Sequence, residues 1–163
     1  MNLADIGTIK KLLNADDFFF LKSLSQDFLI DETVCPRMAD ASCDSETGVL
    51  EIGPGIGVLT TALASKAKRV VAIELDERLR PILKKTLSEH DNIKVIFGDA
   101  MKLDLKALIQ ENFADCKRVA VCANLPYYIT SPIIMMLLES RLPIDNITVM
   151  VQKEAAERLC AEV

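Results

Sequence analysis

The sequence lacks three features that would assign the protein to other common classes. No apolar run reaches the roughly 18 residues that a membrane-spanning helix needs. The five cysteines are scattered without a C-x-x-C pair, which argues against a zinc site and for reduced thiols in a cytoplasmic protein. The first residues contain no apolar stretch of the kind found in secretory signals. We therefore expect a cytoplasmic protein that contacts no membrane and holds no metal.

The sequence also has fewer positive than negative charges. The 163 residues carry a net charge of −5, whereas proteins that bind nucleic acid usually present clustered lysine and arginine to the phosphates. A local basic face is still open, and its candidates are Lys10, Lys11, Lys22, Lys66, Lys68 and Arg69. The more ordinary interpretation is that these are solvated surface charges. Half of the residues are hydrophobic, so the length suffices for one globular domain with a real core.

From residue 48 onward, short apolar runs alternate with segments of helical character. The apolar runs predict strands at 48–52, 69–73, 93–97, 119–123 and 146–151. Helices are predicted at 58–65, 77–88, 105–112 and 132–140, with two earlier ones at 5–14 and 31–40. Continuous apolar strands are typical of a parallel sheet with helices on both faces. The sequence therefore predicts a doubly wound α/β domain over residues 48–163, preceded by a helical arm over residues 1–47.

A glycine loop follows the first predicted strand. Gly53, Gly55 and Gly57 permit a tight turn and a close approach of the backbone to a ligand. The dinucleotide fingerprint G-x-G-x-x-G would need a third glycine at the position of Val58. With Pro54 inside the loop, the pattern favours a ligand made of a nucleoside and an amino acid over a pyrophosphate.

Acidic residues accompany three successive strands. Glu51 precedes the glycine loop and could face the ammonium of a methionine moiety, directly or through water. Glu74 ends the second strand, where a carboxylate can accept both hydroxyls of a ribose. Asp99 follows the third strand and could accept a hydrogen bond from the amino group of an adenine in the cofactor. Any one of them alone is more often a plain polar strand end. Together with the glycines, they predict a cofactor site beyond the carboxyl ends of the strands.

The motif Asn124-Leu125-Pro126-Tyr127 follows the fourth predicted strand. The N6 amine of adenine is a poor nucleophile because its lone pair is delocalised into the ring. The side-chain carbonyl of Asn124 and the backbone carbonyl of Leu125 can accept hydrogen bonds from its two N–H groups. Pro126 stiffens the turn, and Tyr127 can stack on a flipped base. In isolation this motif is more often a simple turn. After a strand of this fold, it predicts methyl transfer to an adenine amine.

With these motifs in place, the sequence from Lys22 onward resembles the ribosomal RNA adenine N6,N6-dimethyltransferase family. The resemblance rests on the segments 22–29, 49–57, 71–76, 98–100, 124–132 and 151–154. It implies a Rossmann-like methyltransferase fold and S-adenosyl-L-methionine as cofactor, held additionally by Gln26, Asp27, Leu29 and Asn124. It also implies dimethylation of two adjacent adenosines near the 3′ end of small-subunit rRNA. The enzyme of such a family is expected to act as a monomer on a ribosomal particle during ribosome biogenesis.

The sequence departs from this family in two places. The family typically reads S-L-G-Q-N-F-L, whereas this chain has Ser25 in place of the glycine and Asp27 in place of the asparagine. An aspartate keeps an acceptor but loses the amide donor and adds a charge, so the affinity for the cofactor is expected to differ. The family also continues with two further strands and a small helical domain. We therefore expect a fragment whose fold is truncated before its last strands.

Three alternatives stay open. The related macrolide-resistance methylases act on large-subunit rRNA, but they usually read Asn-Ile-Pro-Tyr where this chain has Leu125. A nucleotide-dependent oxidoreductase is opposed by the glycine spacing and by the Asn124 motif. A ribosome-assembly factor with weakened catalysis is favoured only by Ser25 and Asp27.

Overall fold

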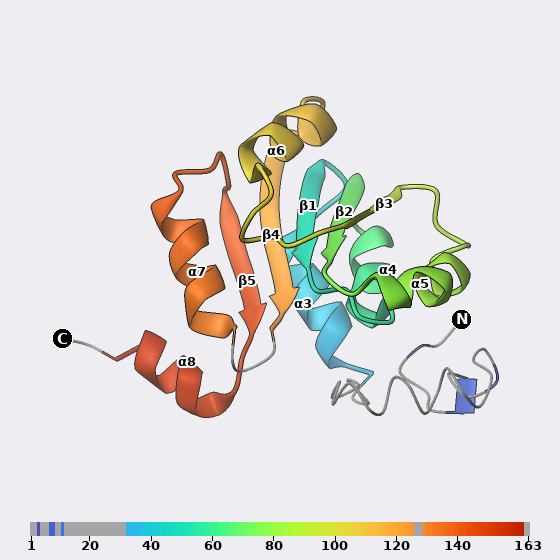
Figure 1. The fold of residues 1–163 in the computed structure, drawn as a ribbon, viewed down its shortest axis with the longest axis horizontal. Coiled ribbons are helices and arrows are strands. Elements are labelled where there is room, and N and C mark those ends of the chain that lie inside the picture. The colour runs from blue at the N-terminus through green and yellow to red at the C-terminus, as the bar shows by residue number, and fades with distance from the viewer. Residues whose placement is uncertain (1–2, 4–6, 9–10, 12–31, 126–128, 162–163) are drawn as a thin grey trace.

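The computed structural model describes residues 3, 7–8, 11, 32–125 and 129–161 of the chain. Its centre is a five-stranded sheet in the order β3-β2-β1-β4-β5, in which all neighbouring strands are parallel (Figure 1). The strands are β1 (Thr47–Ile52), β2 (Arg69–Glu74), β3 (Ile93–Phe97), β4 (Arg118–Asn124) and β5 (Asn146–Met150). This arrangement confirms the doubly wound α/β fold expected from the sequence.

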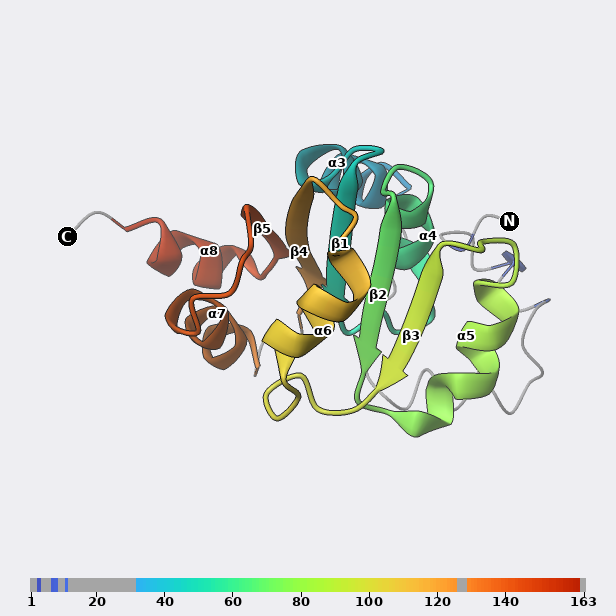
Figure 2. The same cartoon turned by 90° about the horizontal axis from the view of Figure 1, so that it is seen from above.

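Helices connect the strands and cover both faces of the sheet (Figure 2). They are α3 (Val34–Ser42), α4 (Val58–Ala64), η1 (Glu77–Leu79), α5 (Arg80–Thr86), α6 (Leu105–Phe113), α7 (Thr130–Glu139) and α8 (Lys153–Leu159). Helices α6 and α7 lie on one face, while α3 and α4 pack on the other. Among the described helices, none is both long enough and apolar enough to cross a membrane.

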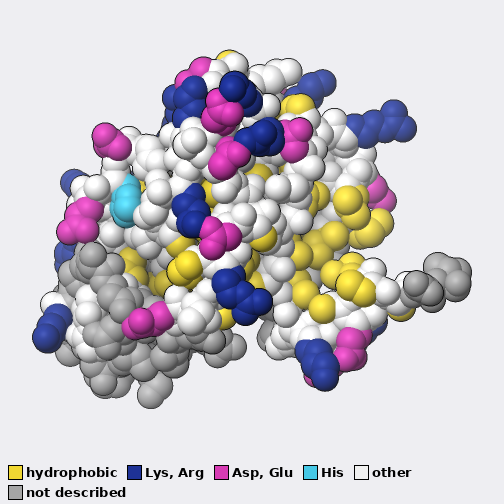
Figure 3. Space-filling model, turned by 180° about the vertical axis from the view of Figure 1, so that it is seen from behind, with side chains coloured by type: hydrophobic (Ala, Val, Ile, Leu, Met, Phe, Trp, Pro, Cys, Tyr) yellow, Lys and Arg dark blue, Asp and Glu magenta, His cyan; other side chains and the backbone are white. Residues whose placement is uncertain are grey.

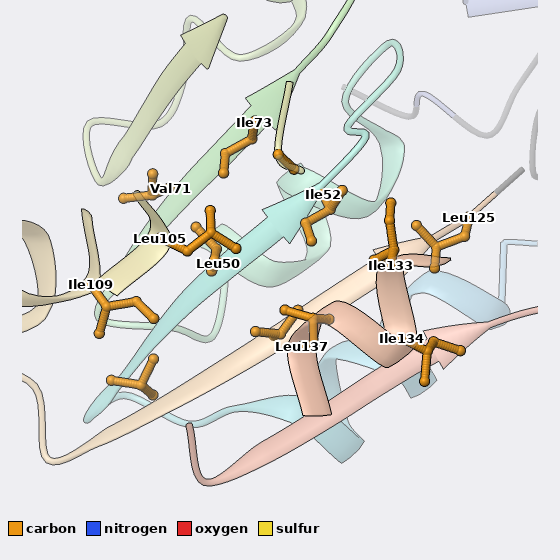
Figure 4. Packing of buried hydrophobic residues seen from close by; sticks show 14 of the residues in the cluster. Leu50, Ile52, Val71, Ile73, Leu105, Ile109, Leu125, Ile133, Ile134 and Leu137 are labelled. Atoms are coloured by element: carbon orange, nitrogen blue, oxygen red, sulfur yellow. The ribbon is translucent and has the colours of Figure 1, made fainter. Parts of the chain in front are cut away.

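The larger core cluster lies between the sheet and the helices α6 and α7 (Figure 4). Leu50 and Ile52 of β1 point into it, because alternate residues of a strand face the same side. Ile109 of α6 and Ile133 of α7 close over them. These side chains are at most 5% exposed, so both helices are fixed against the strands whose ends form the candidate site.

Gly48 in β1 shows how closely α6 approaches the sheet. A Cβ atom at this position would lie 2.4 Å from Cδ1 of Phe113, closer than van der Waals contact allows. The absence of a side chain at residue 48 therefore lets the ring of Phe113 pack directly against the backbone of the central strand.

The order of the strands creates a switch point at the centre of the sheet. From β1 the chain proceeds through β2 to the edge strand β3, and it then returns across the sheet to β4, on the other side of β1. In open parallel sheets the crevice beyond the carboxyl ends of the strands at such a point is the usual ligand site. Here that crevice lies beyond β1 and β4.

The predicted strands agree with the structure to within one residue at each end, while three helices differ. The predicted helix at 77–88 is divided into η1 and α5, because the Asp76 side chain accepts the Arg78 N–H and starts a tight turn before Pro81. Helix α7 begins at Thr130 rather than at residue 132, and α3 begins at Val34 rather than at 31. Most of the predicted helix at 5–14 lies outside the described residues.

The basic residues near the start of β2 do not form a free basic face. Lys66 pairs with Asp40, and Asp115 pairs with Lys68 at 3.2 Å and with Arg69 at 2.8 Å. On the face drawn in Figure 3, lysine and arginine side chains likewise stand among acidic ones. For these residues the ordinary interpretation as surface charges holds.

Candidate functional site

The glycine loop and Asn124 leave neighbouring strands at the same edge of the sheet. Strands β1 and β4 pair in parallel with Ile52 opposite Ala123. Gly53 directly follows Ile52 at the end of β1, and Asn124 directly follows Ala123 in β4, so the two residues start their motifs next to each other. The structure thus brings together two motifs that are about 70 residues apart in the sequence, as their positions after predicted strands indicated.

All three glycines of the loop have left-handed backbone angles. The φ values are +74° at Gly53, +59° at Gly55 and +95° at Gly57, a region that residues with a Cβ enter only at a cost. The Gly53 N–H donates to the Ile73 carbonyl at 2.9 Å, and the Gly57 N–H donates to the Pro54 carbonyl at 2.9 Å. These bonds fix the loop in a tight turn between β1 and α4.

Gly57 and Gly53 differ in how much free space lies beside their backbone. A Cβ at Gly57 would lie 2.7 Å from Cδ2 of Leu87, so this glycine faces packed side chains. A Cβ at Gly53 would meet no atom of the described residues within 4 Å. The backbone of Gly53 therefore borders open space at the carboxyl edge of the sheet, where a ligand can approach the main chain.

Glu74 anchors this loop from the neighbouring strand. Its carboxylate accepts the Gly55 N–H at 3.1 Å through Oε2 and the Asp76 N–H at 2.9 Å through Oε1. The side chain is buried, and this burial raises the pKa of Glu74 above its ordinary value, although the bonds from Asp76 and Gly55 oppose the rise. A second function of Glu74, holding the loop, was not evident from the sequence.

Glu51 is the most deeply buried of the three predicted acidic residues. It is 1% exposed, and neither carboxylate oxygen has a hydrogen-bond partner among the described residues. Burial is the main reason that the pKa of Glu51 is raised to about 8, and the charge of Glu74 adds to the rise. The hydroxyl of Thr60 lies close enough to moderate the rise but is not in hydrogen-bonding geometry. A buried carboxyl without a partner is a costly arrangement that a cationic ligand would relieve.

Asp99 lies two residues beyond the end of β3 and is partly exposed. Its Oδ1 accepts the Met101 N–H at 2.9 Å, and its Oδ2 lies 3.8 Å from Lys102 Nζ. The side chain keeps 32% of its surface accessible, so it retains acceptor capacity for a ligand.

Asn124 and Leu125 are the part of the second motif that the structure describes. Asn124 is the last residue of β4 and pairs with Met150 of β5. Leu125 is buried, and its N–H donates to the Met150 carbonyl at 3.3 Å. This bond fixes the start of the motif between β4 and α7.

The remaining predicted contacts lie outside the described residues. They are Gln26, Asp27, Leu29, Pro126 and Tyr127, and their roles stay predictions from the sequence.

Two exposed apolar side chains next to the acidic residues were not identified from the sequence. Leu75 directly follows Glu74 and is 64% exposed, while Met101 follows Asp99 by two residues and is 42% exposed. Large apolar side chains at a polar strand edge are suited to contacting the faces of an aromatic ring. The signal available in the sequence was a large apolar residue one or two positions after Glu74 and after Asp99.

A separate cavity of about 360 Å³ lies between α5 and β3. Its lining includes Arg80, whose guanidinium carbon lies 3.9 Å from the centre of the Phe97 ring. Within the described part of the chain, none of the predicted site residues lines this cavity.

Comparison with known proteins shows the family of this chain. Residues 18–163 match the family described as ribosomal RNA adenine dimethylase. The chain belongs to this family. Its curated relatives include the ribosomal RNA small subunit methyltransferase A of Bacillus pumilus, 56% identical over 96% of this chain and 55% of the relative. The protein of the same name from Staphylococcus carnosus is 50% identical over 100% of this chain and 56% of the relative. The chain thus spans about half the length of the curated relatives that it matches.

Solved structures of other methyltransferases share the fold. The 23S rRNA methyltransferase ErmE aligns with a TM-score of 0.65 at 32% identity, covering 78% of this chain and 48% of that protein. A dimethyladenosine transferase from Plasmodium falciparum aligns with a TM-score of 0.64 at 34% identity, covering 80% of this chain and 45% of that protein. The Rossmann-like methyltransferase fold expected from the resemblance is therefore confirmed.

Proposed function

We propose that the protein is an S-adenosyl-L-methionine-dependent dimethyltransferase that modifies N6 of two adjacent adenosines near the 3′ end of small-subunit rRNA. The observation that carries this proposal is the placement of Gly53 and Asn124 side by side at the carboxyl ends of β1 and β4. A cofactor loop next to an acceptor for an exocyclic amine is the arrangement that methyl transfer to adenine needs. Membership of the rRNA adenine dimethylase family supports the same reaction.

The residues at the sheet edge fit S-adenosyl-L-methionine. The open space over Gly53 admits a ligand against the backbone, and the unpartnered carboxyl of Glu51 offers an acceptor for an ammonium group. Glu74 has lone pairs left for the ribose hydroxyls, and Asp99 has acceptor capacity for the adenine amino group. We further assign Leu75 and Met101 to the two faces of that adenine. When bound, the cofactor supplies the activated methyl group.

The chain's own contribution to the reaction is positioning. The side-chain carbonyl of Asn124 and the backbone carbonyl of Leu125 accept hydrogen bonds from the two N–H groups of the target amine. These hydrogen bonds direct the lone pair of the amine toward the methyl carbon. Such alignment can supply several kcal/mol of the barrier. The alkylated amine is acidic enough to lose its proton to solvent, so no strong general base is needed. Tyr127 stacks on the flipped adenine and Pro126 stiffens the turn.

The substrate assignment follows the relatives. The small subunit methyltransferases are 50–56% identical to this chain, whereas the 23S rRNA methyltransferase ErmE is 32% identical. Leu125 also departs from the isoleucine usual in the macrolide-resistance methylases. We therefore propose the small-subunit particle in the cytoplasm as partner, with the protein acting as a monomer. Residues 1–47 form the arm that contributes Gln26, Asp27 and Leu29 to the cofactor site, and residues 48–163 form the methyltransferase domain.

A methylation assay on unmodified small-subunit particles tests the proposal. The protein should transfer labelled methyl groups from S-adenosyl-L-methionine to small-subunit rRNA and not to large-subunit particles. Asn124→Ala should lower the single-turnover rate far more than it weakens RNA binding, because its main contact is with the reacting amine. Glu139→Gln, an exposed change on α7, is the matched control. Methylation of large-subunit rRNA instead would assign the protein to the macrolide-resistance type, and an Asn124→Ala variant that reacts at the parental rate would refute the mechanism.

A further inference from the structure

Glu51 is a buried acid for which the described structure provides no compensating charge. It lies in the middle of the sheet, on the central strand, with 1% of its surface exposed. Neither Oε1 nor Oε2 accepts a hydrogen bond from any described residue. Isolated carboxylates in such surroundings take up a proton, because desolvation disfavours the charged form.

Among the described residues, no positively charged group faces Glu51. The side chains facing it from neighbouring elements are Cys35 of α3, Thr60 of α4, Cys122 of β4 and Glu74 at the end of β2. Its register partner on β2 is Ala72, which has no polar side chain. Burial raises the pKa of Cys35 to about 11 and that of Cys122 to about 12, so both thiols are neutral near pH 7. Within the described part of the chain, Glu51 is thus surrounded only by neutral or acidic groups.

The position of Glu51 makes this protonation relevant to ligand binding. It lies two residues before Gly53, whose backbone borders the open space at the sheet edge. The second acid of the loop, Glu74, is already bonded to two backbone N–H groups. Glu51 is therefore the acid at this edge whose acceptor capacity is entirely unused in the described structure.

We infer that the Glu51 carboxyl is protonated in the free protein and releases this proton when the ammonium group of the methionine cofactor binds beside it. The inference rests on the proposed function and deepens it, because it makes cofactor binding a proton-coupled step. The balance is simple: the carboxyl O–H bond breaks, the proton passes to solvent, and the resulting carboxylate pairs with the ammonium. No group is oxidised or reduced.

The affinity for the cofactor should consequently depend on pH in one direction. Burial raises the pKa of Glu51 to about 8, so below that pH the free protein must lose a proton before it can pair with a cation. When the pH is lowered from 7.5 to 6.0, the dissociation constant should rise roughly twentyfold, because the affinity follows the fraction of ionised Glu51. The α-amino group of the cofactor stays largely protonated over this interval.

Isothermal titration calorimetry tests the coupling directly. The parent, Glu51→Gln and the exposed control Glu139→Gln are titrated with S-adenosyl-L-methionine at pH 7 in two buffers of different ionisation enthalpy. The parent and the control should each release about one proton for each cofactor bound. Glu51→Gln should release none and should bind with an affinity that changes less than twofold between pH 6.0 and 7.5. Circular dichroism confirms that each variant is folded.

S-adenosyl-L-homocysteine distinguishes the two positive groups of the cofactor. It keeps the ammonium and lacks the sulfonium charge, so its binding to the parent should release the same proton. Release with S-adenosyl-L-methionine alone would overturn the assignment to the ammonium. Should the parent bind the cofactor without proton release, or should Glu51→Gln release as much as the parent, the inference is wrong while the proposed function stands. A folded parent that fails to bind the cofactor at any pH would overturn both. If Glu51→Gln binds too weakly to titrate, the pH dependence of the parent alone decides.

Discussion

Glu74 is predicted to serve two purposes, and replacing it with glutamine should separate them. The carboxylate accepts N–H bonds from Gly55 at 3.1 Å and from Asp76 at 2.9 Å. In Glu74→Gln the amide keeps one acceptor oxygen, but its NH₂ group faces the other backbone donor. One partly buried N–H then loses its partner, which should lower the free energy of unfolding by about 1–3 kcal/mol. The ribose hydroxyls also lose a charged acceptor worth about 1.5–3 kcal/mol, so the dissociation constant should rise roughly ten- to hundredfold.

Denaturant unfolding and calorimetric titration with S-adenosyl-L-methionine measure the two effects of Glu74→Gln separately. Glu77→Gln is the matched control, because Glu77 is exposed and forms an ion pair with Arg80 at the start of α5. The control should leave the affinity unchanged. Glu74→Ala should lose both bonds to the loop and so be less stable than Glu74→Gln. An unchanged dissociation constant in a variant that is also as stable as the parent would remove Glu74 from both roles.

Four further changes test other parts of the structure. Gly48→Ala should lower the free energy of unfolding by roughly 1–3 kcal/mol, because its Cβ would lie 2.4 Å from Phe113; unchanged denaturant stability would contradict this packing. Gly53→Ala should cost only about 1–2 kcal/mol in folding but weaken cofactor binding in a titration, because its methyl group enters the open space; equal affinity would place the cofactor elsewhere. As the pH rises from 5 to 8, the free energy of unfolding should fall less in Glu51→Gln than in the parent. The folded-state pKa of Glu51 is raised from 4.5 to about 8, so the folded protein favours the protonated carboxyl. This contribution to stability is complete below pH 4.5 and is lost as the pH rises through about 8; parallel pH profiles of the two proteins would refute this. Asp27→Asn should bind the cofactor at least as tightly as the parent, and a folded variant that loses binding would show that the aspartate is a local adaptation.

The strands were predictable because both faces of the sheet are covered. A strand such as Val70–Ile73 must be apolar at every position when helices pack on each side, and this leaves a continuous signal in the sequence. Helix ends were less predictable because they depend on local bonds. Pro132 suggested a helix start, yet α7 begins at Thr130 and carries the proline as its third residue, where a missing N–H costs nothing.

The site was predictable in outline and not in detail. Glycines and acids after successive strands identify the carboxyl edge, since parallel strands bring their ends together. The bond between Glu74 and Gly55 joins two strands and depends on the exact turn of the loop. The burial of Glu51 depends on how α3 and α4 pack over β1. Neither can be read from spacing, because both follow from tertiary contacts between residues distant in sequence.

Several residues at the carboxyl edge of the sheet are unfavourable for the ligand-free protein. At the carboxyl edge, Gly53 takes a left-handed conformation against open space, Glu51 is buried without a partner, and Leu75 is apolar and exposed. Each of these lowers the stability of the ligand-free protein, and a nucleoside cofactor with an ammonium group would relieve the last two. Binding of the cofactor to the folded state can recover this stability cost, so the cofactor should raise the free energy of unfolding.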